Sequence, residues 1–518
     1  MNGAESLLET LEHNGIDVCF ANPGTSEMHF VAALDRSPGV RGVLGLFEGV
    51  VTGAADGYAR MTDRPAATLL HLGPGMANGL SSMHNALRAR SSMVNIIGDH
   101  AGYHRALNAP LTSDIEGAAR PFSHWVRTSP SANTIAQDAA DAIGVSRPGR
   151  IASLILPADT AWSTAAAYTT PPTAQPLPEI AIDECVIEAA ARNLRINGKR
   201  TAILLGGRAL RAEQLALAGK IAQATGATLL SDTFAPRTER GAGRHATMRV
   251  PYPVDAAQQL LSRFDALVIV DSKAPVAFFA YPDKSSVLTA AGTTFYEVSK
   301  PEADSVAALE ALCSAVLGEG AAAAPSTPSR LAPPALPTGT ITADKLAAWL
   351  GSAIPENGIV LDESVTTGRS FFEATMNAQP HDYFTPTGGA IGWALPLAAG
   401  AAIACPDRKV IALESDGSGM YMPQALWTMA REGLDVVSLI FANRKYQILR
   451  NEMHNVGVHD FGAKAESLLD IGSPVIDWVA VSQGMGVPAQ RVETIEELSK
   501  AFEAALSDSG PRLIEVVL

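Results

Sequence analysis

An acidic, glycine-rich turn, ESDGSGM at residues 414–420, directly follows the apolar run 410–413. The run is typical of a buried strand, and the glycines would let the backbone approach a ligand closely. A later strand pattern, 434–442, ends at Asn443. Because a right-handed crossover leaves two such strands parallel, Asp416 and Asn443 are expected at the same carboxyl edge of a sheet. An ordinary surface turn would explain the first motif alone, whereas the paired oxygens favour a site for Mg²⁺ and phosphate.

A second candidate for chemistry is Glu48, which follows the strand pattern 43–46 and opens the helix motif FEGVVTGAADGYAR. Its neighbours Phe47, Val50 and Val51 are apolar, so the carboxyl group is expected to be buried and able to act as an acid. A lone Glu in this position more often only complements a helix N-terminus. The sequence motif around it favours the catalytic interpretation.

Composition excludes several classes of function. The net charge of −14, without a run of Lys or Arg, argues against a nucleic-acid partner. Four cysteines lie far apart without a CxxC motif, which indicates a reducing compartment. The N-terminal residues lack a signal-peptide pattern, and no apolar run is long enough for a membrane helix. We therefore expect a cytoplasmic protein with no membrane partner.

Elements that could position these residues alternate between strand and helix patterns along the whole chain, which predicts an α/β fold with three doubly wound parallel-sheet domains. Two stretches rich in Pro and Ala, 164–180 and 318–339, are expected to be linkers. The predicted domains are 1–163, 181–317 and 340–518. The predicted strands are 17–21, 43–46, 66–72, 93–97 and 151–156, then 202–205, 228–230, 267–270 and 294–298, and finally 359–361, 409–413, 436–441 and 513–517.

Five motifs in this order resemble those of the thiamine diphosphate (ThDP) enzymes of the acetolactate synthase and benzoylformate decarboxylase type. They are FANPGTSEMHF (20–30), FEGVVTGAADGYAR (47–60), LHLGPGMANG (70–79), GGAIGWALPLAAGAAI (388–403) and the pair SDGS (415–418) with Ala442-Asn443. The family's diphosphate motif begins with Gly where this chain has Ser415, and its Asn-Asn pair begins with Asn where this chain has Ala442. Both departures spare the expected metal ligands.

The resemblance implies a role for each matching residue. Asp416, Asn443 and the backbone carbonyl of Lys445 would be ligands of Mg²⁺. The Glu48 carboxyl would act on the aminopyrimidine of ThDP, and Ile391 would support the bent cofactor from below. Gly417, Ser418 and Asn443 would contact its diphosphate. The pyrimidine-binding, central and diphosphate-binding domains would follow one another along the chain, in a homodimer or homotetramer whose active sites lie at the subunit interface.

Other polar residues have less specific roles. The resemblance places Thr25 at the substrate, and His71 at the substrate or in proton transfer, although His71 could also be a core histidine. His100 follows a strand and is expected to contact substrate as a catalytic residue. The spacing of His100 and His104 also suits zinc, but no third ligand is evident. Asp232 and Glu239 are expected on the solvated surface.

The reaction implied by the resemblance breaks or forms the bond next to the carbonyl of a 2-oxo acid, in a benzoylformate decarboxylase-like decarboxylase or carboligase. An acetolactate synthase-type carboligase is the alternative, and a non-catalytic regulatory relative a more remote one. A flavin or nicotinamide oxidoreductase is another rival, but LLGGRAL (204–210) lacks GxGxxG and 268–284 lacks the arginines and paired aspartates that mark FAD binding. We expect no FAD. The segment that carries a second histidine in benzoylformate decarboxylase has Ala280 at that place.

Overall fold

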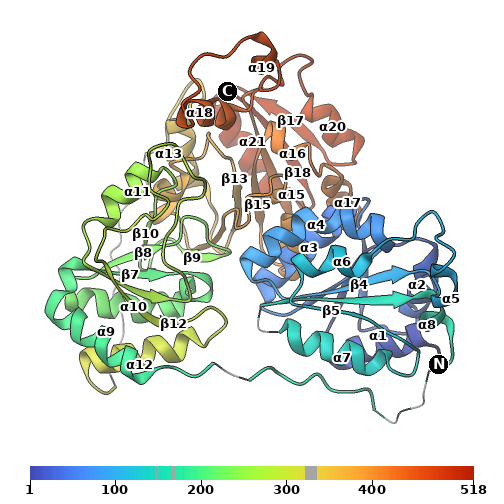
Figure 1. Ribbon diagram of the computed structural model, residues 1–518. Coiled ribbons are helices and arrows are strands. Elements are labelled where there is room, and N and C mark those ends of the chain that lie inside the picture. Colours follow the sequence, from blue (N-terminus) through green and yellow to red (C-terminus); the bar gives the residue numbers. More distant parts are fainter. Residues whose placement is uncertain (148, 166–167, 169, 179, 321–334) are drawn as a thin grey trace.

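The computed structural model describes residues 1–518 except 148, 166–167, 169, 179 and 321–334. It has three parts at the corners of a triangle, each built on one sheet (Figure 1). Parts of both predicted linkers, 164–180 and 318–339, lie outside the described residues. The described part of the first runs along the base of the molecule between the N-terminal and central sheets (Figure 1).

The N-terminal sheet is parallel, with strand order β2-β1-β3-β4-β6-β5, and helices cover both of its faces. The strands β3, β4 and β6 are buried along their whole length, which explains their almost continuous apolar runs. The strands are β1 (Val18–Asn22), β2 (Arg41–Leu44), β3 (Ala66–Leu70), β4 (Met93–Asp99), β5 (Trp125–Thr128) and β6 (Ile151–Pro157). The helices are α1 (Gly3–His13), η1 (Thr25–Glu27), α2 (Met28–Leu34), α3 (Glu48–Thr62), α4 (Leu72–Ala89), α5 (Gly102–Arg105), α6 (Ile115–Ala119), η2 (Arg120–Phe122), α7 (Ile135–Ser146) and α8 (Ala158–Trp162).

The central sheet is also parallel, in the order β10-β8-β7-β11-β12. Its strands are β7 (Thr201–Leu205), β8 (Thr228–Ser231), β10 (Met248–Arg249), β11 (Ala266–Val270) and β12 (Thr294–Ser299). Its helices are α9 (Glu184–Asn197), η3 (Gly198–Arg200), η4 (Gly207–Leu210), α10 (Ala212–Thr225), α11 (Val254–Leu261) and α12 (Ser305–Leu317).

The C-terminal sheet has the order β17-β18-β16-β15-β13-β14-β9. Its edge strand β9 (Thr238–Arg240) comes from the central part of the sequence and pairs antiparallel with β14. The other strands are β13 (Ile359–Glu363), β14 (His381–Phe384), β15 (Val410–Ser415), β16 (Val436–Ala442), β17 (Ala489–Val492) and β18 (Arg512–Val517). The helices are α13 (Ala343–Ala353), α14 (Phe371–Ala374), η6 (Thr375–Asn377), α15 (Ala394–Ala404), α16 (Asp416–Gly419), α17 (Gln424–Glu432), α18 (Gln447–Asn455), α19 (Ala463–Ser467), α20 (Trp478–Gly484) and α21 (Ile495–Ser507).

The predicted α/β class with three sheets is confirmed, and every strand predicted from an apolar run is present. Strands β5, β9, β10, β14 and β17 were not predicted. They are short and carry polar residues, such as His381 and Asp382 in β14, so they show no apolar run. In the part of the chain that the structure describes, no helix combines the length and apolarity that a bilayer crossing requires.

Asp232 and Glu239 are not solvated surface residues, as the sequence suggested. Asp232 lies at the end of β8 and accepts a hydrogen bond of 2.5 Å from Ser272, and burial raises the pKa of its carboxyl to about 7. Glu239 accepts bonds of 2.9 Å from Arg237 and from the backbone N–H of Ala212. Tertiary partners, which local sequence does not reveal, bury the carboxyl of Asp232 and hold the half-buried carboxylate of Glu239 in place.

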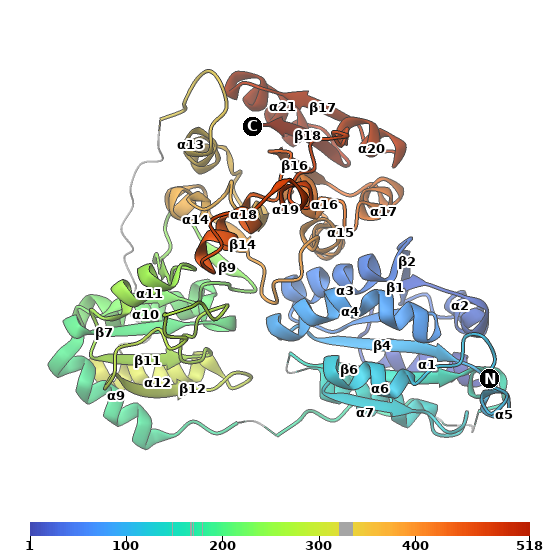
Figure 2. The ribbon, with the colours of Figure 1, turned by 45° about the horizontal axis from the view of Figure 1, so that its top comes forward.

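Helix α3 and helix α15 join the N-terminal and C-terminal sheets through a close contact that excludes side chains. An added Cβ at Gly400 would lie 1.8 Å from the carbonyl oxygen of Ala54, and one at Gly57 would lie 2.1 Å from that of Leu397. Figures 1 and 2 both show α3 directly below the C-terminal sheet. Backbone-to-backbone packing of this kind requires glycine.

Replacing Gly400→Ala should therefore separate α3 from α15 and destabilise the protein by about 1–3 kcal/mol, the usual cost of overpacking a core. Thermal or urea unfolding measures the effect. Gly484→Ala is the matched control, because an added Cβ there meets nothing within 4 Å. Equal stability of the two variants would contradict the close packing.

Candidate active site

Asp416 and Asn443 lie beside each other at the carboxyl edge of the C-terminal sheet. The neighbouring parallel strands β15 and β16 pair Ser415 with Phe441 at their ends, so the residues that follow share one edge. The Asp416 carboxylate accepts bonds from the backbone N–H groups of Gly417 (3.0 Å) and Arg444 (2.6 Å). Burial raises the pKa of Asp416 to about 6. The right-handed crossover expected from the sequence thus accounts for the common edge at which Asp416 and Asn443 lie.

The donor set at this edge fits a hard divalent cation. Asp416 supplies a carboxylate, Asn443 a side-chain amide oxygen and Lys445 a backbone carbonyl. All-oxygen ligands of this kind suit Mg²⁺, which retains water and binds phosphate oxygens. The loop is held in place by an antiparallel bridge between Lys445 and Asp470 and by a 2.9 Å bond from Tyr446 N–H to Leu469 O. The residues present therefore fit a metal–diphosphate complex.

The two glycines of the DGSG turn allow aromatic side chains to pack closely against it. An added Cβ at Gly417 would meet the ring of Tyr446 at 2.5 Å, and one at Gly419 would meet Trp478 at 2.8 Å. The Ser418 hydroxyl bonds to the buried carboxylate of Glu414. Its side chain is thus engaged within the protein, which leaves backbone groups as the donors that Gly417 and Ser418 can offer to a diphosphate.

Ile391 lies half-buried in the loop between β14 and α15, and Glu363 fixes this loop. Glu363, at the end of β13, accepts bonds from the N–H groups of Gly392 (2.6 Å) and Ala394 (2.8 Å). It faces Glu414 in the register of β13 and β15. Burial raises the pKa of Glu363 to about 7, and burial together with Glu363 raises the pKa of Glu414. The two carboxyl groups thus anchor the loop of Ile391 and the DGSG turn by hydrogen bonds.

Glu48 is the first residue of α3, and only 6% of its surface is exposed. One carboxylate oxygen accepts a 2.9 Å bond from the amide of Asn78. The other, Oε1, has no hydrogen-bond partner among the described residues and faces Gly75, whose added Cβ would lie 3.1 Å away. A buried carboxyl with one free oxygen beside a glycine fits a ligand's ring nitrogen.

His71 lies between β3 and α4, against the loop that contains Thr25. Its Nδ1 is 2.8 Å from Oε2 of Glu27, and Gly24 is packed so tightly that an added Cβ would lie 2.2 Å from that ring nitrogen. Burial raises the pKa of Glu27, although the bond to His71 opposes the shift. When Nδ1 donates to this carboxylate, Nε2 is left as the reactive nitrogen. Thr25 is exposed at the start of η1.

His100 follows β4, which neighbours β3, so it lies at the same edge as His71. Its Nε2 is buried and has no hydrogen-bond partner among the described residues. The rings of His100 and His104 are 5.1 Å apart, and the described residues contain no group of three or more metal-binding side chains there. The arrangement suits contact with a polar ligand or water.

Sequence reasoning missed Glu27, Asn78, Glu363 and Phe278. Glu27 lies within the motif 20–30 and Asn78 within the motif 70–79, so a polar side chain inside a motif was the signal that could have found them. Glu363 ends β13, two residues beyond the strand predicted at 359–361. Phe278 contacts Gly389 from a distant segment: an added Cβ on Gly389 would lie 2.6 Å from the ring. No local signal reveals that contact.

Comparisons with known proteins agree with this geometry. Residues 1–117 match the thiamine pyrophosphate enzyme N-terminal TPP binding domain, and residues 367–516 match the C-terminal TPP binding domain of the same enzymes. The chain is 48% identical to "Putative acetolactate synthase large subunit IlvX" of Mycobacterium tuberculosis, over 100% of this chain and 99% of that protein. It is 28% identical to benzoylformate decarboxylase of Pseudomonas aeruginosa, over 98% and 97% of the two chains.

Solved structures show the same fold. The ThDP-dependent 4-hydroxybenzoylformate decarboxylase of Rhodococcus jostii RHA1 superposes with a TM-score of 0.81 at 25% identity, over 99% of this chain and 98% of that one. Benzoylformate decarboxylase from Polynucleobacter necessarius superposes with a TM-score of 0.84 at 21% identity, over 100% and 99%. This chain belongs to the ThDP-dependent enzymes of the acetolactate synthase and benzoylformate decarboxylase superfamily.

Proposed function

We propose that the protein is a Mg²⁺- and ThDP-dependent enzyme that cleaves or forms the bond next to the carbonyl of a 2-oxo acid, as a decarboxylase or carboligase. The observation that carries this proposal is the buried Glu48 carboxyl with one free oxygen. When bound, ThDP supplies the electron sink that makes loss of CO₂ possible. An acetolactate synthase-type carboligase is the second candidate, supported by the 48% identity to a protein of that name.

In this proposal Asp416, Asn443 and the Lys445 carbonyl would hold Mg²⁺, which would neutralise the diphosphate charge. Backbone groups of Gly417 and Ser418 add donors, and Ile391 supports the middle of the cofactor. The Glu48 carboxyl, oriented by Asn78, would hold or release a proton at Oε1 towards the aminopyrimidine. The metal loop, the Glu363-braced loop and the α3 N-terminus thus each hold one part of the cofactor.

His71 and His100 handle the remaining protons, and Thr25 contacts the substrate carboxylate. His71 is oriented by Glu27, and the buried Nε2 of His100 is available to a ligand. Ala280, in the exposed segment beside Phe279, provides no acid or base of its own. Proton delivery to a decarboxylated product therefore depends on the two histidines of the N-terminal sheet.

This dependence gives a testable expectation: aldehyde release is slow unless a second carbonyl compound captures the product. Single-turnover decarboxylation of a 2-oxo acid, with and without an added aldehyde, measures it. His71→Ala should slow release without acceptor by about 10²-fold or more, since a positioned acid or base contributes 10²–10⁴-fold. The exposed His29→Ala is the matched control. Fast release that neither the acceptor nor His71→Ala changes would refute the assignment.

We further propose that the central domain binds no FAD. The Arg90 guanidinium forms an ion pair with Asp271 and lies where an added Cβ of Gly207 would meet it at 2.1 Å. It fills the space above the turn after β7, where a nucleotide phosphate would approach the backbone. Asp232 and Asp271, both at strand ends, would repel a phosphate there.

The division into domains 1–163, 181–317 and 340–518, the cytoplasmic location and the homo-oligomer are part of the same proposal. Large apolar side chains are exposed at both cofactor-facing edges. Tyr103 (73%) and Leu107 (71%) follow His100, and Leu468 (76%) lies beyond the metal loop. Such exposure supports a second copy that covers these edges, with Glu48 of one protomer serving the cofactor held by the other.

A further inference from the structure

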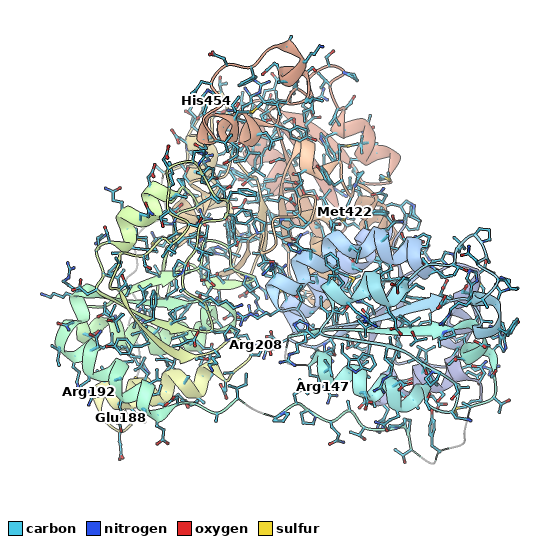
Figure 3. The ribbon with its side chains drawn as sticks, viewed as in Figure 1. Arg147, Glu188, Arg192, Arg208, Met422 and His454 are labelled. Atoms are coloured by element: carbon cyan, nitrogen blue, oxygen red, sulfur yellow. The ribbon has the colours of Figure 1, made fainter. Side chains whose placement is uncertain are left out.

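A polar pocket of about 570 Å³ lies between the central part and helix α18. We call it the α18 pocket. Its walls include Tyr252, Tyr281, Arg369, Asn451, Glu452 and Asn455. Figures 1 and 2 show α18 close to the loops beside α11, and Figure 3 labels His454 of the same helix on the side of the central part. The pocket thus joins elements that are far apart in sequence.

Two walls of the α18 pocket continue directly from the candidate active site. Helix α18 begins at Gln447, two residues after the Lys445 carbonyl. The opposite wall belongs to the segment of Phe278, whose ring meets Gly389, two residues before Ile391. Phe278 in turn packs on Tyr252 with ring centroids 5.8 Å apart. The same two segments thus carry candidate active-site residues and the walls of the pocket, so a substrate chain that leaves the site along them would enter the pocket.

The pocket wall both donates and accepts hydrogen bonds. The Tyr281 hydroxyl donates a 2.8 Å bond to Glu452 across the two sides. Burial is the main cause that raises the pKa of Tyr281, and Tyr252 and Glu452 add to it, so its hydroxyl stays protonated and donates. The Asn455 amide donates a 3.3 Å bond to Oε1 of Glu452. The Asn451 oxygen accepts a 2.8 Å bond from Gln447. The Asn455 oxygen can still accept from a ligand, and the Asn451 NH₂ group can still donate to one. An apolar ligand would leave hydrogen-bonding capacity of these groups unpaired, and burying unpaired polar groups costs free energy.

The charges of the wall balance. Lys284 pairs with Asp255 at 2.7 Å. Arg369 and Glu452 are each without an ion pair among the described residues, and they contribute one charge of each sign. A wall with no net charge and mixed donors and acceptors is complementary to hydroxyl groups, which donate to Glu452 and accept from Arg369 and the amides. A phenyl or alkyl chain would offer no partner to the Arg369 guanidinium, the Asn451 NH₂ group or the Asn455 oxygen. A second carboxylate on the ligand would be repelled by Glu452.

From this geometry we propose that the α18 pocket binds the hydroxylated chain of a substrate, so that the reacting partner is a hydroxylated 2-oxo acid or a hydroxylated aldehyde. This inference rests on the proposed function for its chemistry. The hydroxylated chain, rather than an aromatic ring, determines specificity, and Tyr281 and Glu452 are the residues that recognise it.

The hydroxylated chain could belong to the donor 2-oxo acid or to the acceptor aldehyde. Two matched pairs of probes distinguish these cases: 4-hydroxy-2-oxobutanoate against 2-oxobutanoate, and D-glyceraldehyde against propanal. Ligand-detected NMR titration of the protein supplied with ThDP and Mg²⁺ measures binding whether or not the compounds react. The hydroxylated member of one pair should bind at least about tenfold more tightly, since one good hydrogen bond is worth about that factor. A preference in the first pair identifies the donor acid, and one in the second pair the acceptor.

Tyr281→Phe and Glu452→Gln should each reduce that preference to about threefold or less. Tyr296→Phe, a partly buried tyrosine packed against the core of the central part, should leave it unchanged. Circular dichroism verifies that α18 is retained in each variant. Equal binding within both pairs, or a preference that both variants retain, would overturn the proposal. Failure of the proposed function is recognised separately, because it abolishes CO₂ release from every 2-oxo acid without altering these binding ratios.

Discussion

Asp416→Ala should abolish retention of ThDP. The Asp416 carboxylate is the one charged side chain among the proposed metal ligands, and removing it leaves an amide and a carbonyl that cannot balance the charge of Mg²⁺. Loss of a residue that only orients a ligand typically costs 10–100-fold in metal affinity, so loss of the ligand itself should exceed about 100-fold. ThDP released from denatured protein after gel filtration measures occupancy, and dialysis against EDTA should have the same effect on the unaltered chain.

Two variants separate loss of the metal from loss of folding. Asp416→Asn keeps one oxygen that can accept from the backbone N–H of either Gly417 or Arg444, but it loses the second acceptor and the charge, so it should fold and still lose ThDP. Asp407→Ala, an exposed acid on the turn before β15, should retain it. Full ThDP occupancy in Asp416→Ala would overturn the assignment of the site.

Glu48→Gln should bind ThDP but exchange the C2 proton of the cofactor about 10²–10⁴-fold more slowly, the usual contribution of a positioned acid–base group. Glutamine preserves the shape of the side chain and its bond to Asn78, but it cannot transfer the proton. NMR of the cofactor after quenching in D₂O measures the exchange.

A matched control for this change exists in the same chain. Glu184 is the first residue of α9, as Glu48 is of α3, but it is exposed. Glu184→Gln should cost only the modest stability of a helix N-terminal charge, about 0.3–1 kcal/mol, and leave exchange unaltered. Near-normal exchange in Glu48→Gln would mean that Glu48 only complements the N-terminus of α3, as Glu184 does for α9.

Much of the fold was predictable because buried parallel strands read as apolar runs, as in β4 and β16. The neighbourhood of Asp416 and Asn443 followed from the handedness of one crossover. The capping box of α21 at Thr494 was predictable from four residues. In each case the deciding interactions lie within a short stretch of chain.

What could not be predicted depends on contacts between distant segments. The bond of Glu27 to His71 joins loops 44 residues apart, and the Tyr281–Glu452 bond joins residues 171 apart. Asp232 was expected on the solvated surface, yet its carboxyl is buried and accepts a bond from Ser272 in the turn after β11. The strand predicted at 66–72 ends at Leu70, because helix α4 begins at Leu72 and includes GPG (73–75) in its first turn.

Strand β9 sets a limit on how this chain can be recombined with its relatives. Residues 238–240 lie between strands of the central sheet in sequence, yet they form the edge of the C-terminal sheet, where Thr238 pairs with Tyr383. A chimera that exchanges the whole middle third would remove this strand and expose the backbone of β14 as a new edge, which invites association between chains. Exchange of central modules would therefore have to leave 238–240 with the C-terminal sheet, so the middle third is not inherited as an independent unit.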